Sequence, residues 1–297
     1  MKSGFVSLIG RPNVGKSTLL NSIINEHVAI TSNKAGTTRN IIQGIYNEDD
    51  YQIIFVDTPG IGKPQSKLNR YLNKESLNQT KDVDCICFIV DVASGIGRGD
   101  LYILDTLKDC DIPVILVMNK IDRLTNAQIM ENIDKFKDIY PFAEIVPVSA
   151  IKKDNIERLI EVIKKYIKDE VQYFPKDEYT CSTLSFMVSE IVREKILNST
   201  EDEVPHSVTC YTIKYEEKKD IVNICVDIIV DRDSIKKIII GKGGNKLKEI
   251  GIEARKDIED LVGKKVYLET YVKTIENWKE KESYLVELGF IDSTDKL

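Results

Sequence analysis

The sequence is poor in the side chains from which zinc sites are built. It has two histidines, His27 and His206, which lie far apart, and none of its six cysteines forms a Cys-x-x-Cys pair. These counts argue against a metal site of the zinc type. We expect the cysteines to be small buried hydrophobic residues in a reducing cytosol, with Cys85 and Cys87 on one face of a strand.

Long apolar runs are also missing. The longest, such as residues 112–118, have the length of a strand, whereas a membrane-spanning helix needs roughly 18–20 apolar residues. The first residues lead directly into a strand-like pattern, which leaves no room for a signal peptide. We therefore expect neither a secreted nor a membrane-spanning protein.

The length and the charge of the chain allow two domains with different tasks. The 297 residues suffice for two domains of about 100–200 residues each, and 42% hydrophobic with 30% charged residues exclude a wholly disordered chain. The net charge of −6 is unusual for a nucleic-acid-binding protein, but residues 232–248 contain six basic residues and one acidic residue. This window either binds phosphate groups or forms a solvated helix face, and its charge alone does not decide.

The N-terminal half alternates between strand-like and helical patterns. Continuous apolar runs, typical of buried parallel strands, occupy residues 5–9, 83–90, 113–118 and 145–148. Helical patterns occupy residues 17–25, 99–108, 125–139 and 155–168. Two further runs, 41–46 and 51–56, flank a polar turn and predict a hairpin. We expect an α/β domain over residues 1–170, with a doubly wound, mostly parallel sheet and one antiparallel strand; the polar residues 61–80 predict a mobile loop.

The alternation stops near residues 169–175, where Tyr173-Phe174-Pro175 interrupts the helical period among clustered acids. We expect a linker at residues 171–181 and a smaller α+β domain at residues 182–297. Its helices are predicted at residues 184–197, 234–240, 245–261 and 276–288. Its strands are predicted at residues 207–215, 221–231 and 265–272.

One phosphate-binding motif follows the first strand. The residues Gly10-Arg11-Pro12-Asn13-Val14-Gly15-Lys16-Ser17 fit G-x-x-x-x-G-K-[ST] between a strand and a helix. Glycines let consecutive backbone N–H groups point at phosphate oxygens, and the helix N-terminus adds partial positive charge. Lys16 is predicted to reach the β- and γ-phosphates, and Ser17 to ligate Mg²⁺. The motif predicts a nucleoside triphosphate site without choosing the base.

Three later strands end in residues that suit the rest of a nucleotide. Asp57-Thr58-Pro59-Gly60 offers a carboxylate that holds Mg²⁺ through water and a Gly60 N–H that senses a γ-phosphate, although this segment alone could be a simple turn. Asn119-Lys120-Ile121-Asp122 offers a carboxylate that accepts hydrogen bonds from guanine N1–H and N2–H₂, which adenine lacks. Ser149-Ala150 offers backbone N–H groups to guanine O6. All four segments should meet at one edge of the sheet.

In this order the motifs resemble the P-loop GTPases. Thr38, which precedes Arg39, resembles the switch threonine of their bacterial branch, and by that resemblance it ligates Mg²⁺ only with GTP. The resemblance also implies nucleotide contacts at Thr18 and K⁺ binding at Asn13, and it makes Lys16, Thr38 and Gly60 the residues that act in hydrolysis. Ile61 departs from the pattern of Ras-like enzymes, in which a glutamine there orients the attacking water; we therefore expect slow intrinsic hydrolysis.

The second half carries a glycine turn of a different kind. Gly241-Lys242-Gly243-Gly244 joins two predicted helices, and such a G-x-x-G turn lets helix ends approach a nucleic-acid backbone closely. A glycine-rich helix connection is the alternative, but the predicted β-β-α-turn-α-β order and the basic window favour a type II KH domain, a fold that clamps about four nucleotides. The predicted RNA contacts are Ile240, Gly241, Lys242, Gly243, Gly244 and Lys246.

With both halves considered, the chain resembles the Era family of GTPases over essentially its whole length. Besides the GTPase motifs, the resemblance rests on these segments: 193–197, Val204-Pro205-His206-Ser207, 240–244, Lys264-Lys265-Val266-Tyr267-Leu268 and Trp278. Of these, Pro205-His206-Ser207 and residues 264–268 are more specific than the GTPase motifs, which many families share. It implies a factor that binds GTP and GDP with Mg²⁺, binds 16S rRNA near its 3′ end and assists assembly of the small (30S) ribosomal subunit. It also implies a cytoplasmic protein with some peripheral membrane association, which we expect to be a monomer.

Three classes of function remain to be weighed. The sequence favours a switch whose nucleotide state gates RNA binding. A plain RNA-binding module with a degenerate nucleotide site conflicts with the intact Lys16, Ser17, Asp57 and Asp122, and weak GTP binding would revive it. A small-molecule kinase conflicts with the guanine-reading motif and the lack of an evident lid, and product analysis separates it, since a kinase transfers the γ-phosphoryl group instead of releasing phosphate.

Overall fold

The computed structural model describes residues 1–291, which form two compact units. The first unit contains Met1–Ala29, Thr38–Gln65 and Leu72–Cys181. The second begins at Ser182 and also takes in the short segments Ile30–Thr37 and Ser66–Tyr71. Within the described residues, no helix combines the length and the apolar character that a membrane crossing requires.

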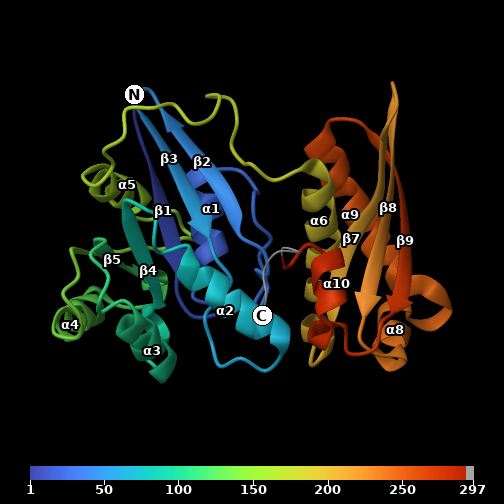
Figure 1. Ribbon diagram of the computed structural model, residues 1–297, viewed down its shortest axis with the longest axis horizontal. Helices are drawn as coiled ribbons and strands as arrows, with labels where there is room; N and C mark the ends of the chain where they lie inside the picture. The colour runs from blue at the N-terminus through green and yellow to red at the C-terminus, as the bar shows by residue number, and fades with distance from the viewer. Residues whose placement is uncertain (292–297) are drawn as a thin grey trace. The chain divides into compact units, whose positions relative to one another are not determined.

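The first unit is built on a six-stranded sheet (Figure 1). Its strands are β1 (Lys2–Ile9), β2 (Ile42–Glu48), β3 (Tyr51–Asp57), β4 (Cys85–Asp91), β5 (Val114–Asn119) and β6 (Glu144–Pro147). They lie in the order β2-β3-β1-β4-β5-β6, and every neighbouring pair is parallel except β2 with β3. The predicted mostly parallel sheet with one antiparallel strand is confirmed.

Five α-helices connect these strands: α1 (Lys16–Ile24), α2 (Lys67–Asn78), α3 (Arg98–Thr106), α4 (Asn126–Lys137) and α5 (Ile156–Lys164). Two 3₁₀ turns, η1 (Val92–Ser94) and η2 (Ile121–Arg123), follow β4 and β5. Strands β4 and β5 are buried along nearly their whole length, which explains their continuous apolar sequence. Thr125 caps α4, since its hydroxyl accepts a hydrogen bond from the Gln128 N–H.

The strand register places the polar ends of neighbouring strands beside one another. Leu8 lies beside Asp57, and Asp91 lies beside Asn119. Because β1, β3, β4 and β5 are parallel, their carboxyl ends share one edge of the sheet. The fold therefore gathers residues that are more than a hundred positions apart in the sequence.

The expectation of a mobile loop over residues 61–80 was wrong, because α2 occupies most of it. Leu68, Leu72 and Ser76 are all buried and recur every four residues, so one stripe of the helix faces the protein. The Ser76 hydroxyl donates to the Pro59 carbonyl at 2.9 Å. Polar residues on the remaining surface of the helix concealed this stripe in the sequence.

The second unit contains a three-stranded sheet with helices packed on it (Figure 1). Its strands are β7 (Val208–Glu217), β8 (Ile221–Val230) and β9 (Lys265–Thr274), in the order β7-β8-β9, the first pair antiparallel and the second parallel. Its helices are α6 (Leu184–Ser199), α7 (Val204–Ser207), α8 (Asp233–Ile240), α9 (Asn245–Val262) and α10 (Glu282–Glu287), with 3₁₀ turns η3 (Lys242–Gly244) and η4 (Trp278–Glu280). The predicted order β7-β8-α8-turn-α9-β9 is confirmed.

The core of this unit follows from the alternation along β8. Val222, Ile224, Val226, Ile228 and Val230 all point to one face and pack with apolar residues of α6, α8 and α9. The other face of the strand carries polar residues such as Asn223 and Asp227 between its apolar ones. This pattern fixes which face of the sheet the helices cover.

Two smaller expectations were wrong. The helix predicted over residues 276–288 is divided into η4 and α10, because Asn277 has φ 52° and Lys281 is extended. The cysteines form no disulfide among the described residues but are not uniformly buried, since Cys181 is exposed and Cys110 is half-buried. Both lie outside the strands that bury the other four.

Candidate nucleotide and nucleic-acid sites

The phosphate-binding loop is shaped by one buried asparagine. Gly15 has φ 97°, and a Cβ atom there would lie 2.3 Å from Asn119 Nδ2, so only glycine fits. That Nδ2 donates to the Val14 carbonyl at 2.8 Å, while Asn119 Oδ1 accepts from the Ala150 N–H at 3.0 Å. Asn119 therefore ties three strand-end segments together.

Lys16 places a cation inside the loop. The side chain is buried, and Nζ donates to the carbonyls of Gly10 and Arg11, each at 3.2 Å. Burial lowers the pKa of the Lys16 ammonium to about 8, and the nearby Asp57 carboxylate opposes this shift. The loop thus holds the amine against its own backbone carbonyls.

Three oxygens from separate segments meet beside Lys16. Ser17 Oγ donates to Asp57 Oδ2 at 2.6 Å and lies 2.8 Å from Thr38 Oγ1. Asp57 is fully buried, and its Oδ1 has no hydrogen-bond partner among residues 1–291. Burial raises the pKa of Asp57 to about 6, although Lys16 and the Ser17 hydroxyl oppose the rise.

This oxygen set fits Mg²⁺, which takes one or two carboxylates together with substrate phosphates and water. Within the described part of the chain, no three His, Cys, Asp or Glu residues lie close enough to hold a metal ion. A cation at Ser17, Thr38 and Asp57 would therefore depend on the phosphates of a bound nucleotide for the rest of its ligands.

The segment after Asp57 approaches the phosphate loop closely. A Cβ atom at Gly60 would lie 2.6 Å from the Pro12 nitrogen, so a side chain is excluded there. The next N–H, that of Ile61, donates to the Gly10 carbonyl at 3.2 Å. The Ile61 side chain is only 1% exposed and lies in the hydrophobic core, so it presents no polar group to a phosphate.

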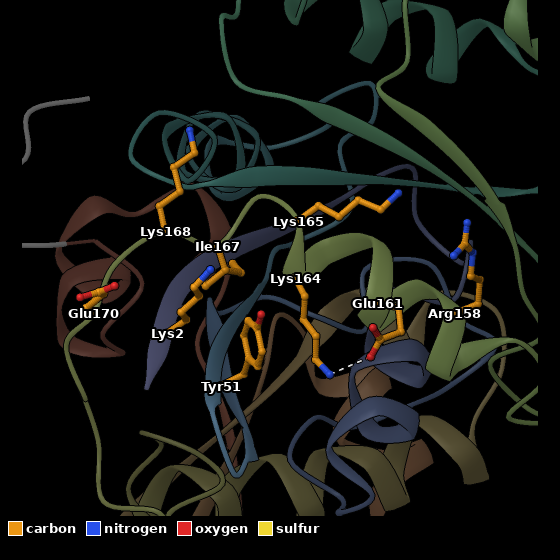
Figure 2. A pocket seen from close by; sticks show the side chains of 9 residues that line it. All are labelled: Lys2, Tyr51, Arg158, Glu161, Lys164, Lys165, Ile167, Lys168 and Glu170. Carbon is orange, nitrogen blue, oxygen red and sulfur yellow. Dashed lines mark hydrogen bonds and ion pairs between the residues drawn. The ribbon is translucent and has the colours of Figure 1, made fainter.

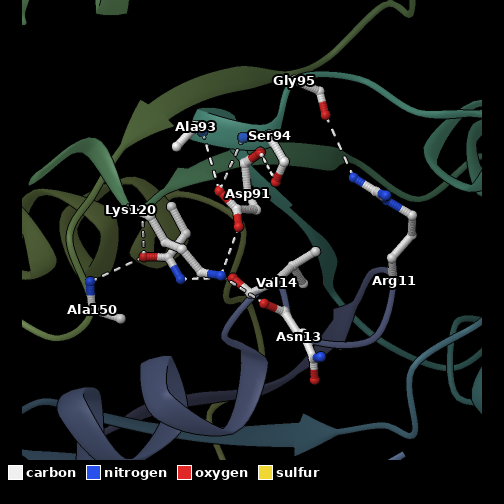
Figure 3. A network of polar contacts seen from close by, with 10 residues as sticks. Arg11, Asn13, Val14, Asp91, Ala93, Ser94, Gly95, Lys120 and Ala150 are labelled. Atoms are coloured by element: carbon white, nitrogen blue, oxygen red, sulfur yellow. Dashed lines mark hydrogen bonds and ion pairs between the residues drawn. The ribbon is translucent and has the colours of Figure 1, made fainter. Parts of the chain in front are cut away.

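Lys120, in the segment predicted to read guanine, links β5 to the loop at residues 10–17 (Figure 3). Its Nζ donates to Asp91 Oδ2 and to the Asn13 carbonyl, both at 2.7 Å. Burial acts to raise the pKa of Asp91, but the hydrogen bond and charge of Lys120 hold it below the usual value. Asp91 also accepts from the N–H groups of Ala93 and Ser94. Sequence reasoning missed Asp91, although its place at the end of an apolar strand was an available signal.

Asp122 has one oxygen occupied and one open. Its Oδ1 accepts from Ser149 Oγ at 2.5 Å, while its second oxygen has no hydrogen bond within residues 1–291, and the side chain is exposed. The two N–H groups assigned to guanine O6 are both engaged: that of Ser149 with the Asp154 carbonyl at 3.1 Å, and that of Ala150 with Asn119. Of the groups predicted to contact the base, the Asp122 carboxylate is therefore the one that stays accessible.

In the second unit, the glycine turn has the positive φ angles that its three glycines suggested. Gly241, Gly243 and Gly244 have φ of 73°, 62° and 81°, in the left-handed region that favours glycine. A Cβ atom at Gly241 would lie 2.7 Å from Lys246 Cβ. The turn therefore joins α8 to α9 with almost no bulk of its own.

The basic window next to this turn is largely free to meet phosphates. Arg232 is the exception, because it pairs with Glu203 at 3.3 Å. The remaining basic residues make no ion pair with any described residue: Lys236, Lys237, Lys242, Lys246 and Lys248. Free lysines beside a bare backbone turn suit a nucleic-acid backbone.

A groove runs from this turn between α9 and β9. Its α9 side is lined by Gly244, Leu247, Lys248, Gly251, Ile252 and Arg255. Its β9 side is lined by Val266, Tyr267, Leu268 and Thr270. Of the predicted RNA contacts only Gly244 lines the groove. The α9 residues recur at helical spacing and include an exposed isoleucine, Ile252, which was the signal that sequence reasoning passed over.

A second depression, in the first unit, lies beside the carboxyl-terminal end of α5 (Figure 2). Its lining includes several lysines, but Lys164 is already paired with Glu48 at 2.6 Å and Glu161 at 2.7 Å. In Figure 2 the amines of Lys164, Lys165 and Lys168 point in different directions. They do not converge on one point, so we assign no ligand to this depression.

Known proteins share both units of the chain. Residues 5–120 match the 50S ribosome-binding GTPase family, and residues 203–279 match the KH domain family. The chain is similar to a point variant of Era from Aquifex aeolicus bound to GDP and AlF₄⁻, with 38% identity, a TM-score of 0.94, and coverage of 98% of this chain and 99% of that one. It is equally similar, at 38% identity, TM-score 0.95 and the same coverage, to Era in complex with MgGDPNP and nucleotides 1506–1542 of 16S ribosomal RNA.

Proposed function

Because this chain belongs to the Era family of GTPases, we propose that it is a GTP-hydrolysing switch that binds 16S rRNA near its 3′ end and assists assembly of the 30S subunit. The observation that carries the proposal is the cluster of Ser17, Thr38 and Asp57 oxygens beside Lys16, together with the open carboxylate of Asp122. We assign the GTPase domain to residues 1–170, the linker to 171–181 and the KH domain to 182–297.

In this proposal the first unit binds GTP along the carboxyl edge of its sheet. The backbone N–H groups of residues 10–18 surround the phosphates, and Lys16 neutralises their charge. Ser17, Thr38 and Asp57 (the last through water) hold Mg²⁺, which supplies further charge neutralisation when bound. Asp122 selects guanine with its open oxygen, while Asn119 and Lys120 hold the loops in place.

Hydrolysis is expected to be slow without a partner. Ile61 is buried and offers no hydrogen bond to an attacking water. Thr38 and the Gly60 N–H remain as the groups that respond to a γ-phosphate, and a K⁺ ion held by Asn13 would add positive charge near the phosphates. RNA or another ribosomal contact would then supply the missing acceleration.

The second unit would hold single-stranded RNA at its glycine turn and groove. The N–H groups and free lysines around Gly241–Gly244 contact phosphates, with Ile240 and Lys246 beside them. The groove between α9 and β9 adds apolar surface for unstacked bases and positive charge from Lys248 and Arg255. We further propose that the protein acts as a monomer in the cytoplasm, with peripheral contact at the inner face of the membrane that co-sedimentation with anionic lipid vesicles would measure.

The first experiment measures GTP turnover by the full chain, alone and with an RNA that spans the 3′ tail of 16S rRNA. A scrambled RNA of equal length and ATP serve as controls. We expect slow release of phosphate from GTP alone, a clear increase with the 3′ RNA, and no turnover of ATP. Equal turnover of ATP and GTP, or failure to bind the 3′ RNA better than the scrambled one, would contradict the proposal.

A further inference from the structure

The Arg11 side chain leaves the phosphate loop instead of lining it. Its guanidinium forms an ion pair with Asp100, with Nε 2.8 Å from Oδ1, and Nη2 donates to the Gly95 carbonyl at 3.4 Å. Figure 3 shows Arg11 extending toward Gly95 and away from Lys120. Neither Arg11 Nε nor Asp100 Oδ1 makes an aligned hydrogen bond with any of residues 1–291, so the contact is held by charge.

The segment before α3 is shaped to receive this side chain. A Cβ atom at Gly99 would lie 2.6 Å from Arg11 Cδ, and one at Gly97 would lie 3.1 Å from Arg11 Nη1. Asp100 is fully buried, and its Oδ2 accepts from the Gly97 N–H at 2.8 Å, which fixes the carboxylate. A buried carboxylate that lost its arginine would be left with an uncompensated charge.

The residues on either side of Arg11 carry the proposed chemistry. The Gly10 carbonyl accepts from both Lys16 Nζ and the Ile61 N–H, each at 3.2 Å. Pro12 lies against Gly60, with no room for a Cβ atom between them. Any displacement of residues 10–12 would therefore move Lys16 and the Gly60 segment together.

We infer that Arg11 is a positioning residue for GTP hydrolysis, which acts through Asp100 to hold residues 10–12 of the phosphate loop in register with Gly60. The inference rests on the proposed assignment of residues 10–17 to the phosphates. The ion pair anchors this turn from outside the loop, while Lys16 Nζ holds the Arg11 carbonyl from within it. Loss of the ion pair would therefore loosen the backbone N–H groups and Lys16. Small misplacements of such groups cost catalysis more than they cost folding.

The test compares Arg11→Gln, Asp100→Asn, the double variant and Arg11→Lys in the full chain, with Arg98→Gln as the matched control. Arg98 is an exposed arginine on the same segment, outside the ion pair. For each variant, kcat and KM for GTP, the release rate of GDP and the melting temperature are measured. We expect Arg11→Gln to lower kcat about tenfold and to speed GDP release by a similar factor. Arg11→Lys should recover part of both losses, and Arg98→Gln should match the parent protein.

The double variant distinguishes positioning from direct phosphate contact. If Arg11 acts through Asp100, the double variant is no worse than Arg11→Gln, because the interaction is already lost. It also leaves no unpaired buried charge, so it remains informative if a single variant fails to fold.

Three results would overturn the inference. The first is a folded Arg11→Gln protein with unchanged kcat and GDP release. The second is a double variant whose fold-losses in kcat equal the product of the losses in the two single variants. The third is a loss of kcat in Arg98→Gln as large as that in Arg11→Gln. Lys16→Ala tests the underlying assignment separately. If this variant keeps tight GTP binding, residues 10–17 are not the phosphate loop. If it loses GTP binding while Arg11→Gln is unaffected, only the positioning role of Arg11 is rejected.

Discussion

The proposed nucleotide site and the proposed RNA groove are built in opposite ways. The nucleotide site gathers segments from residue 10 to residue 150 and locks them with buried side-chain hydrogen bonds, such as those of Asn119 and Ser17. The groove is lined by residues between 244 and 270, and its one lining lysine, Lys248, makes no ion pair with any described residue. A rigid polar site rejects a wrong ligand because that ligand leaves buried polar groups of the site without hydrogen bonds. An open basic surface binds phosphates through attractions that add up charge by charge. Single substitutions should therefore have large, selective effects in the first and graded effects in the second.

The largest effect is expected from Asp122→Asn. Asparagine keeps an oxygen for the Ser149 hydroxyl but places an NH₂ donor where guanine presents donors. GTP affinity should fall about a hundredfold, and xanthosine triphosphate, which offers an acceptor there, should bind better than GTP. Competition binding with the two nucleotides measures the change, and RNA affinity without nucleotide is the control. Unchanged GTP selectivity would show that Asp122 does not read the base.

A smaller effect is expected from Gly243→Asp, which adds a carboxylate to the glycine turn. No described residue places an atom within 4 Å of the new Cβ, and φ is 62°, a conformation that aspartate tolerates better than most residues. Repulsion of phosphate should lower RNA affinity about tenfold and leave GTP binding unchanged. Gly263→Asp is the matched control, because Gly263 has φ 66° and equally open surroundings but lies at the other end of α9, outside the glycine turn. Equal losses of RNA affinity in both variants would remove the special role of the turn.

The smallest effect is expected from Lys248→Ala, which removes one charge from the groove wall. RNA affinity should fall about two- to fivefold, and the slope of log affinity against log salt should become shallower by about 0.7 for single-stranded RNA. Lys256→Ala removes the same charge from α9 at a position that does not line the groove. RNA titrations at several salt concentrations measure both slopes. A slope unchanged in Lys248→Ala, or changed equally in both, would place the RNA elsewhere on the unit.

Local pattern predicted most of the fold and failed where burial depended on distant neighbours. The apolar runs of β4 and β5 predicted buried parallel strands because both faces of those strands are covered. Helix α2 was missed because only a narrow stripe, including Leu68 and Leu72, is apolar. The helix predicted over residues 276–288 is longer than the helix in the structure, because the sequence around Asn277 does not reveal its left-handed backbone.

The residues of the candidate site also fall into those that motifs predicted and those whose partners depend on the fold. Motifs predicted Lys16, Ser17 and Asp57, and the structure brings their side chains together. They did not predict Asp91 or Asp100, since an aspartate after a strand or in a helix is common and its partner is set by the fold. The groove along α9 was likewise visible only when β9 lay beside it.

The sequence by itself determined the family and most of the order of strands and helices, and it predicted the residues of the nucleotide site, because these depend on spacing along the chain. Only the tertiary structure decided that Asn119 shapes Gly15, that Arg11 turns to Asp100 and that one oxygen of Asp122 stays open. Those features depend on distances between segments far apart in sequence. Such distances follow from packing and strand register, which no local pattern encodes.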